Sequence, residues 1–407
     1  MNKKKISVIG LGYIGLPTAT LLASRGFKVD GVDINPLIIK NLNKKKCHIK
    51  EKGVDQLLAL SLNSGNLSLK SIPQASDVFI IAVPTPITKG AKMPKPNIKM
   101  VIEAVRSIIE LIEDYNLIII ESTVPMGTTN LIRELLEDKG INTEKIYIAH
   151  CPERVLPGNI LDELIHNDRI IGGINKKSSQ AAEDFYKIFV KGKIYQTEAK
   201  TAELCKLTEN SFRDVNIAFA NELSMICDKE NINVYELINL TNKHPRVNIL
   251  QPGPGVGGHC IAVDPWFIIS QNPNLSKVMT ASRQVNLEKT KWVFDKIISE
   301  TDRCKSEKNI EPVIACFGLT FKPDVDDIRE SPSIEILEKL SNKGFSLLVV
   351  EPNIKKYKNF KIIKQSEAIK RANILVFLVN HKEFKTIKNH KKLEEKLLLD
   401  FCDFLSF

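Results

Sequence analysis

The sequence predicts an α/β protein in which a long central helix joins two doubly wound domains. Three observations predict it: a glycine-rich turn between a strand and a helix near the N-terminus, a helical pattern over residues 200–231, and a second succession of strand, glycine, helix, strand and acid near the C-terminus. Alternating strands and helices favour parallel sheets of the Rossmann-like type. We expect domain boundaries at 1–198, 199–305 and 306–407.

The first domain opens with a dinucleotide-binding pattern. The apolar residues 6–9 are followed by Gly10, Gly12 and Gly15 in the spacing G-x-G-x-x-G, then by a helical stretch and a strand that ends at Asp33. The first glycine makes the tight turn, the second lets the backbone approach a pyrophosphate, and the third lets the helix pack on the strand. Because an acid at this place bonds ribose hydroxyls and repels a 2′-phosphate, the pattern predicts NAD as the cofactor.

Two further strands each end in a threonine. Thr85 follows the strand in DVFIIAVPTP, and Thr123 follows the strand in NLIIIESTVPMGTT. Ligands of doubly wound sheets lie at the carboxyl edge of the strands, so both threonines are candidate cofactor contacts. Each of them alone is equally compatible with a turn residue or a helix cap.

The stretch 200–231 predicts one helix, far longer than average. At 100° per residue, one side carries an apolar set: Leu204, Leu207, Val215, Ala218, Phe219 and Ile226. Lys206, Asn210 and Arg213 share the opposite side, which becomes apolar again at Ile217 and is therefore not expected to be fully exposed. A helix of this length between two α/β regions is also a natural dimer surface.

A glycine-rich loop carries the most distinctive cysteine. Cys260 follows four glycines of GPGVGGHC: Gly253, Gly255, Gly257 and Gly258. Missing side chains leave room for another molecule to approach the backbone, as a reactive thiol would need. We expect Lys206 to be the cation that activates the thiol and Asp264 to hold Lys206 or a water, while His259 is expected to pack or hydrogen-bond elsewhere.

An NAD site and an activated thiol in one chain indicate a class of reaction. A cysteine adds to an aldehyde to give a thiohemiacetal, which loses a hydride to give a thioester that water cleaves to an acid. Simple oxidation of an alcohol has no use for such a thiol. The pairing therefore predicts either an aldehyde dehydrogenase or an enzyme that takes an alcohol to an acid in two oxidations.

The C-terminal region repeats the nucleotide-binding succession without the tight glycine fingerprint. A strand in PVIACFGL leads to the loop TFKPDVDDIRE, a helix capped by Ser331, and a strand that ends at Glu351. Lys322 and Arg329 flank the loop near the start of that helix, where a diphosphate would be well placed. This predicts a nucleotide-linked substrate, although charged loop residues are often merely solvated.

Composition excludes several other classes of protein. The 407 residues are 43% hydrophobic and 26% charged, which is ordinary for a globular chain of two or three domains. The eight cysteines form no C-x-x-C pair, so we expect no metal and no disulfide framework. The net charge of +10 comes from scattered lysines, so we expect no nucleic acid partner. Without a signal peptide or a bilayer-spanning apolar run, we expect a cytoplasmic protein with no membrane partner.

Motifs along nearly the whole chain resemble those of the nucleotide-sugar 6-dehydrogenases, the UDP-glucose/GDP-mannose dehydrogenase family. They are GLGYIGLP, VPTP, ESTVPMGTT, CPERVLPG, KLTENSFRDVNIAFANE, HPRVNILQPGPGVGGHCIAVDPWF and CFGLTFKPDVDDIRESP. The resemblance implies an NAD-binding domain, a central dimerisation domain with the cysteine loop, a UDP-sugar-binding domain, and a homodimer. HPRVNILQPG further implies a four-electron oxidation at C6 of UDP-N-acetyl-D-mannosamine, with UDP-N-acetylglucosamine or UDP-glucose as alternatives.

The resemblance also implies roles for matching residues. The catalytic residues would be Cys260 as nucleophile, Lys206 as proton donor or acceptor, and Glu153 and Asp264 as groups that position water or relay protons. The cofactor contacts would be Gly10, Gly12, Tyr13, Ile14, Gly15, Asp33, Thr85, Thr123 and Arg329. The substrate contacts would be Arg154, Val155, Lys206, Asn210, Arg213, Gly257 and Lys322, together with His244 and Arg246 reaching the partner subunit's substrate.

One segment departs from the family pattern. The last strand often ends in Asp-x-Lys-Gly, whose lysine contacts the substrate, but here Cys402 and Asp403 take the places of lysine and glycine. That contact is therefore absent or met by another lysine. A different class of protein, a non-catalytic sensor of NAD or nucleotides, remains the alternative, but a sensor would not need Lys206, Asn210, Cys260 and Asp264 together.

Overall fold

The computed structural model describes residues 4–88, 93–156, 158–387 and 393–405. The chain divides into two compact units. One consists of residues 1–209 and 266–271, and the other of residues 210–265 and 272–407. The predicted central helix is present as α8 (Ala199–Lys229), which begins in the first unit and continues into the second. No helix in the described residues is both long and apolar enough to cross a membrane.

The first unit contains an eight-stranded sheet in the order β3-β2-β1-β4-β5-β6-β7-β8. Its strands are β1 (Lys5–Ile9), β2 (Lys28–Val32), β3 (Leu67–Lys70), β4 (Val78–Ile81), β5 (Leu117–Ile120), β6 (Tyr147–His150), β7 (Arg169–Gly173) and β8 (Ile194–Glu198). Neighbouring strands are parallel except for β6 and β7. Every side chain of β4 and β5 is buried, which is typical of central parallel strands covered on both faces.

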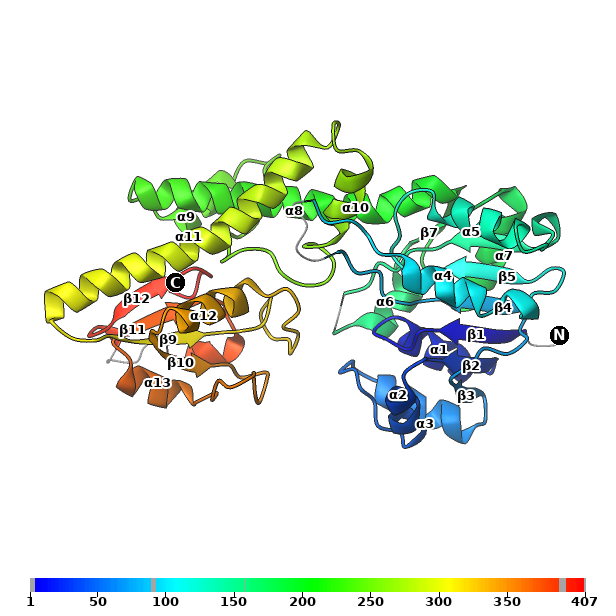
Figure 1. Ribbon diagram of the computed structural model, residues 1–407, viewed down its shortest axis with the longest axis horizontal. Helices are drawn as coiled ribbons and strands as arrows, with labels where there is room; N and C mark the ends of the chain where they lie inside the picture. The colour runs from blue at the N-terminus through cyan, green and yellow to red at the C-terminus, as the bar shows by residue number, and fades with distance from the viewer. Residues whose placement is uncertain (1–3, 89–92, 157, 388–392, 406–407) are drawn as a thin grey trace. The chain divides into compact units, whose positions relative to one another are not determined.

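Helices cover both faces of this sheet (Figure 1). They are α1 (Gly15–Ser24), α2 (Pro36–Asn43), α3 (Val54–Asn63), α4 (Lys99–Arg106), α5 (Thr128–Glu137), α6 (Ile160–His166) and α7 (Lys176–Tyr186), with short 3-10 turns η1 (Ile109–Leu111) and η2 (Thr143–Lys145). Buried side chains of α1, α3, α6 and α7 form one core with the sheet, and those of α4 and α5 form another on the opposite face. The arrangement is the predicted doubly wound one.

The second unit contains a four-stranded parallel sheet in the order β10-β9-β11-β12. Its elements are α9 (Val234–Thr241), α11 (Lys277–Lys308), β9 (Val313–Phe317), α12 (Pro332–Asn342), β10 (Ser346–Val350), α13 (Gln365–Arg371), β11 (Ile374–Phe377), η3 (Lys382–Ile387) and β12 (Leu397–Asp400). Helices α11 and α12 cover one face, while α13 and η3 cover the other. Helix α10 (Asp264–Gln271) follows the cysteine loop, and its residues 266–271 belong to the first unit.

The two sheets begin with the same local construction. Gly10 and Gly318 both follow the first strand with φ of +92°, and both donate their N–H to the last carbonyl of the next strand. In the first unit the N–H of Leu11 donates to Asp33, and in the second the N–H of Leu319 donates to Glu351. This confirms a second Rossmann-like domain, predicted from the succession of strand, glycine, helix, strand and acid.

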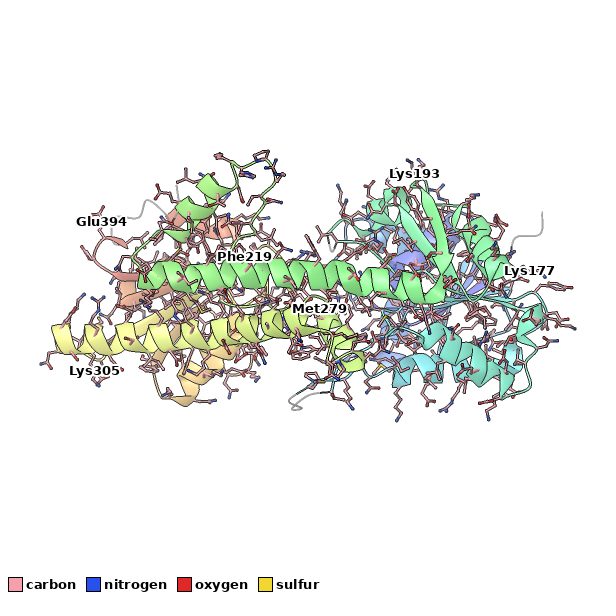
Figure 2. The ribbon with its side chains drawn as sticks, turned by 90° about the horizontal axis from the view of Figure 1, so that it is seen from above. Lys177, Lys193, Phe219, Met279, Lys305 and Glu394 are labelled. Atoms are coloured by element: carbon pink, nitrogen blue, oxygen red, sulfur yellow. The ribbon has the colours of Figure 1, made fainter. Side chains whose placement is uncertain are left out.

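Within the second unit, α8 packs beside α11 through buried polar groups (Figure 2). The Arg283 guanidinium donates to the Asp214 carboxylate over 2.6 Å, and Asn286 donates to the same oxygen over 2.8 Å. The expected apolar side of α8 is only partly covered, because Phe219 and Ile226 remain 52% and 51% exposed. Helical periodicity shows which residues share a face but not how far the face is covered.

Candidate active site

The glycine turn after β1 has the geometry that a dinucleotide requires. A Cβ on Gly10 would lie 2.5 Å from the Ala82 carbonyl oxygen, and one on Gly15 would lie 1.8 Å from the Gly10 oxygen. A Cβ on Gly12 would meet nothing within 4 Å. The first and third glycines therefore permit the tight turn and close helix packing, while the second leaves open backbone for a ligand.

Asp33 is fixed at the end of β2 beside this turn. One carboxylate oxygen accepts the N–H of Leu11 over 3.0 Å, and the other accepts the N–H of Asn35 over 2.9 Å. Helix α1 starts close by without a side-chain cap, and the half-buried Tyr13 and Ile14 lie at its N-terminal end. An acid held at this strand end, next to an uncapped helix N-terminus, fits the ribose and the pyrophosphate of NAD.

The ends of β4 and β5 are tied together at the same edge of the sheet. The N–H of Val83 donates to Ser122 Oγ over 2.9 Å, and that hydroxyl donates to the Val83 carbonyl over 2.7 Å. Thr85 and Thr123 follow these strands and are half-buried. Their contact with a cofactor stays a prediction.

Glu153 lies in the loop after β6 and is 6% exposed. One of its oxygens accepts the N–H of Arg154 over 2.6 Å, and the other forms an ion pair with Arg169 over 3.1 Å. The Arg154 side chain pairs with Glu209 over 2.7 Å, while Val155 packs against the core. The loop that carries Glu153, Arg154 and Val155 is thus anchored by charge and by apolar contact.

Lys206 is a half-buried residue of α8 that belongs to the first unit. The pKa of His150 is lowered to about 3, mainly by burial and in smaller part by the charge of the nearby Lys206. One helical turn before Lys206, the Glu203 carboxylate accepts the N–H groups of Gly127 and Thr129 over 2.5 and 2.7 Å at the N-terminus of α5. These contacts hold the start of α8 on the first unit, and with it the amine of Lys206.

Cys260 lies in the second unit on a turn that runs into α10. Its carbonyl accepts the N–H groups of Val263 and Asp264 over 3.0 and 2.8 Å, and the residue is half-buried. Asp264 is 3% exposed and accepts a hydrogen bond from the Asn210 side chain over 2.6 Å. The structure thus brings together three of the predicted residues, Asn210, Cys260 and Asp264.

The glycines before Cys260 make room for the protein's own atoms. A Cβ on Gly255 would lie 2.2 Å from Thr290 Oγ1, and one on Gly257 would lie 2.6 Å from the Glu330 carbonyl oxygen. Gly258 has a φ of +83°, and a Cβ there would lie 2.9 Å from the Phe321 ring. The expectation that the glycines leave space for an approaching molecule was therefore wrong at Gly255, Gly257 and Gly258, where the missing side chains let the cysteine loop pack against α11 and the loop after β9.

The loop after β9 carries its own ion pair. The Arg329 guanidinium donates to the Asp327 carboxylate through Nε over 2.9 Å and Nη2 over 2.6 Å. Burial opposes the effect, but these hydrogen bonds lower the pKa of Asp327. His259 Nδ1 lies 3.8 Å from Asp327, which agrees with a role for His259 away from the thiol. Lys322 is half-buried beside the Phe321 ring.

The remaining predicted substrate residues are on the surface. Arg213, His244 and Arg246 are exposed, and His244 Nδ1 accepts the N–H of Arg246 over 3.3 Å. The side chain of Asn242 bonds the backbone of Ile249 in both directions, over 3.0 and 2.7 Å, and closes this loop. The loop therefore presents the side chains of His244 and Arg246 outward, as a contact with a partner subunit would need.

Asp403, which departs from the family pattern after the last strand, lines a cavity of about 880 Å³ within the second unit. Asp400, Asp403 and Tyr235 line it, and the Tyr235 hydroxyl accepts the N–H of Asp403 over 2.8 Å. Another lysine lies in the same lining: Lys289 donates to Ser224 Oγ over 2.8 Å and lies 3.8 Å from the centre of the Trp292 ring. Burial lowers the pKa of Lys289 to about 7, and sequence reasoning had not singled it out.

Fold and local geometry define a nucleotide-dependent oxidoreductase: a dinucleotide turn with its acid, a second nucleotide-binding-type sheet, and a cysteine on a constrained turn. The chain belongs to the UDP-glucose/GDP-mannose dehydrogenase family, whose NAD binding, central and UDP binding domains match residues 4–190, 200–288 and 315–406. It is accordingly an NAD-dependent nucleotide-sugar dehydrogenase.

Similar proteins agree on the class but differ in the sugar. A UDP-N-acetyl-D-mannosamine dehydrogenase of Campylobacter jejuni is 50% identical, with 99% of this chain and 100% of the relative covered. An NDP-N-acetyl-D-galactosaminuronic acid dehydrogenase of Ralstonia nicotianae is 46% identical, with 98% and 95% covered. The structure of a UDP-N-acetyl-mannosamine dehydrogenase from Staphylococcus aureus has a TM-score of 0.89 at 42% identity, with 99% and 96% covered.

The position of Asp33 predicts that Asp33→Ala weakens NAD binding. Loss of a hydrogen bond between a carboxylate and a ligand removes about 1.5–3 kcal/mol, or roughly a 10- to 100-fold loss of affinity. NAD titration of the purified variant measures this, with Asp55→Ala on the exposed side of α3 as the control. Unchanged affinity for NAD and an unchanged preference over NADP would contradict the assignment.

The packing of the cysteine loop predicts that Gly257→Ala destabilises the protein and alters the thiol. The new methyl group would overlap the Glu330 carbonyl and Phe321, so the free energy of unfolding should fall by about 1–3 kcal/mol. Gly253→Ala is the matched control, since its Cβ would meet only the Gly255 oxygen at 3.8 Å. Urea unfolding and the alkylation rate of Cys260 measure both effects; equal behaviour of the two variants would refute the explanation.

Proposed function

We propose that the protein oxidises C6 of UDP-N-acetyl-D-mannosamine from an alcohol to a carboxylate in two NAD-dependent steps. The observation that carries the proposal is the turn in which the Cys260 carbonyl accepts the N–H of Asp264, whose buried side chain is held by Asn210. Relatives and solved structures named for UDP-N-acetyl-mannosamine support the choice of sugar. The galactosaminuronic acid relatives support a second sugar, an N-acetylgalactosamine nucleotide.

In the proposed reaction, one set of residues binds the cofactor, and Cys260 forms and breaks bonds with the substrate. NAD, when bound by the glycine turn, Asp33, Tyr13, Ile14, Thr85 and Thr123, accepts the hydride in each oxidation. Cys260 Sγ adds to the carbon of the aldehyde formed first and gives a thiohemiacetal. The second oxidation removes the C6 hydride and the hydroxyl proton and leaves a thioester. Water then adds to this carbon, the C–S bond breaks, and the acid leaves as the thiol is restored.

The charged residues have matching roles in this proposal. Lys206 gives and takes the proton at the C6 oxygen and stabilises its developing negative charge. Glu153 and Asp264 orient water and accept its proton when the thioester is cleaved. Asn210 holds Asp264 in place, as its 2.6 Å hydrogen bond indicates.

Further residues are proposed to bind the substrate. Arg154, Val155, Arg213, Gly257 and Lys322 contact the sugar nucleotide, and Arg329 contributes to the cofactor side. Gly257 contributes through its backbone, since its missing side chain serves the packing of the loop.

A second copy of the chain is the proposed partner of α8. Phe212, Phe219 and Ile226 recur every seventh residue and therefore share one side of the helix. They remain 67%, 52% and 51% exposed, more apolar surface than a solvated helix needs. A symmetric dimer would bury this stripe against itself, and His244 and Arg246 would then reach the partner subunit's substrate.

The oxidation state of the product tests the reaction. Each molecule of sugar nucleotide that is fully converted should release two NADH. UDP-N-acetyl-D-mannosamine should react faster than UDP-N-acetylglucosamine, UDP-glucose and UDP-N-acetylgalactosamine. Cys260→Ser should form little or no acid, while Cys47→Ser, a half-buried cysteine of the first unit, should react as the parent does. One NADH with an accumulating aldehyde, or full acid production by Cys260→Ser, would refute the thioester route.

The dimer is tested by Phe219→Glu. A charge in the middle of the apolar stripe should shift the protein from dimer to monomer and reduce activity, because the substrate would lose His244 and Arg246 from the other subunit. Light scattering after gel filtration measures the mass. Leu60→Glu, which changes a leucine of α3 that is 62% exposed, is the control. A Phe219→Glu protein with the mass of the parent dimer would exclude this surface.

A further inference from the structure

Behind Glu153 the first unit buries a second carboxyl group that the proposed mechanism does not use. Glu121 directly follows β5 and is 3% exposed. The Tyr186 hydroxyl of α7 donates to its Oε1 over 2.7 Å. The same Tyr186 ring lies 4.9 Å from the guanidinium carbon of Arg169, the arginine that pairs with Glu153. Two acids and one arginine thus share a single buried cluster.

The two acids differ in the cation that pairs with them. Glu153 accepts the backbone N–H of Arg154 on Oε1, and its Oε2, which also makes no hydrogen bond of ordinary geometry within the described residues, lies 3.1 Å from the charged Arg169 guanidinium. Glu121 has the phenol of Tyr186, while its Oε2 makes no hydrogen bond of ordinary geometry in the described part of the chain, although the Thr18 hydroxyl of α1 lies beside it. Without a cation paired to it, a bare buried oxygen is tolerated far better on a neutral acid than on a carboxylate. If one of the two acids holds a proton, it is Glu121.

Charge balance leads to the same conclusion. Arg169 neutralises one carboxylate, so a second ionised acid would leave the buried cluster with a net negative charge. We propose that Glu121 is a positioning residue for Glu153: it stays protonated while Arg169 pairs with Glu153, and its ionisation strengthens Glu153 as a base. The inference rests on the proposed role of Glu153 in cleaving the thioester.

Within this buried cluster, Glu121 is the group that changes charge near neutral pH, because its neighbours Cys151, Tyr186 and Arg169 do not. Burial raises the pKa of Glu121 to about 7; Arg169 lowers it, Glu153 raises it, and the hydroxyls of Tyr186 and Thr18 lower it. Burial raises the pKa of the Cys151 thiol to about 12 and that of Tyr186 well above its ordinary value, so both stay neutral. Although burial opposes it, the neighbouring acids raise the pKa of Arg169, which stays charged.

The sign of the effect follows from these charges. Below the pKa of Glu121, the cluster of Arg169 and ionised Glu153 is neutral. Above it, the cluster carries one net negative charge, which raises the proton affinity of Glu153. The pKa of Glu121 is higher in the folded state than in the unfolded state. As pH rises between these two pKa values, the unfolded state loses the proton first, so the stability of the fold decreases. Glu121→Gln should therefore gain stability relative to the parent from about pH 5 to about pH 8.

Infrared titration of the full-length protein tests the protonation directly. The carbonyl band of a protonated carboxylic acid should be present at about pH 6 and fade through about pH 7. It should be missing in Glu121→Gln and kept in Glu110→Gln, which changes an exposed acid of η1. A band that persists in Glu121→Gln, or a parent protein without the band, would overturn the proposal.

The coupling to Glu153 is tested by the pH profile of kcat. In Glu121→Gln, the change of kcat with pH near pH 7 should disappear. At about pH 8 its kcat should be roughly tenfold lower than that of the parent, with KM changed less than about twofold. A profile that superimposes on the parent's would overturn the coupling. Glu153→Gln separates the two proposals: full activity in that variant removes the proposed role of Glu153, while the infrared band still reports whether Glu121 holds the proton.

Discussion

Close packing of glycines fixes the turn that carries Cys260, and the proposed chemistry depends on this constraint. Gly257 and Gly258 lie so near Glu330 and Phe321 that no side chain fits between them. On the other side of the thiol, the hydrogen bond from Asn210 to Asp264 ties the turn to α8. A nucleophile acts efficiently only when it is held within a fraction of an ångström of its productive position, and these two contacts supply that support.

Local signals allowed most of the fold to be predicted. The spacing from Gly10 to Asp33 identified the dinucleotide turn because each glycine answers a short-range steric need, which the structure shows at Gly10 and Gly15. The same reasoning found the second domain, whose Gly318 and Glu351 reproduce the turn and its acid without the other glycines. Helical periodicity gave the length of α8 almost to the residue.

What sequence reasoning missed depends on contacts between distant segments. The cysteine loop needs its glycines because Phe321 and Glu330 lie against it, and no local pattern indicates those neighbours. Glu121 directly follows an entirely apolar strand, which was a usable signal, but Tyr186, which bonds it, and Arg169, which lies over the Tyr186 ring, come from elements far along the chain. The exposure of Phe219 likewise depends on what covers the helix rather than on its period.

The covalent role of Cys260 is tested most directly by the mass of the protein during turnover. Enzyme quenched in acid while it oxidises UDP-N-acetyl-D-mannosamine should carry one acylated sugar nucleotide, and peptide mapping should find it on the peptide that contains Cys260. Acid preserves a thioester, so the intermediate should survive the quench. Protein of unmodified mass throughout turnover, or an adduct on another residue, would contradict the account.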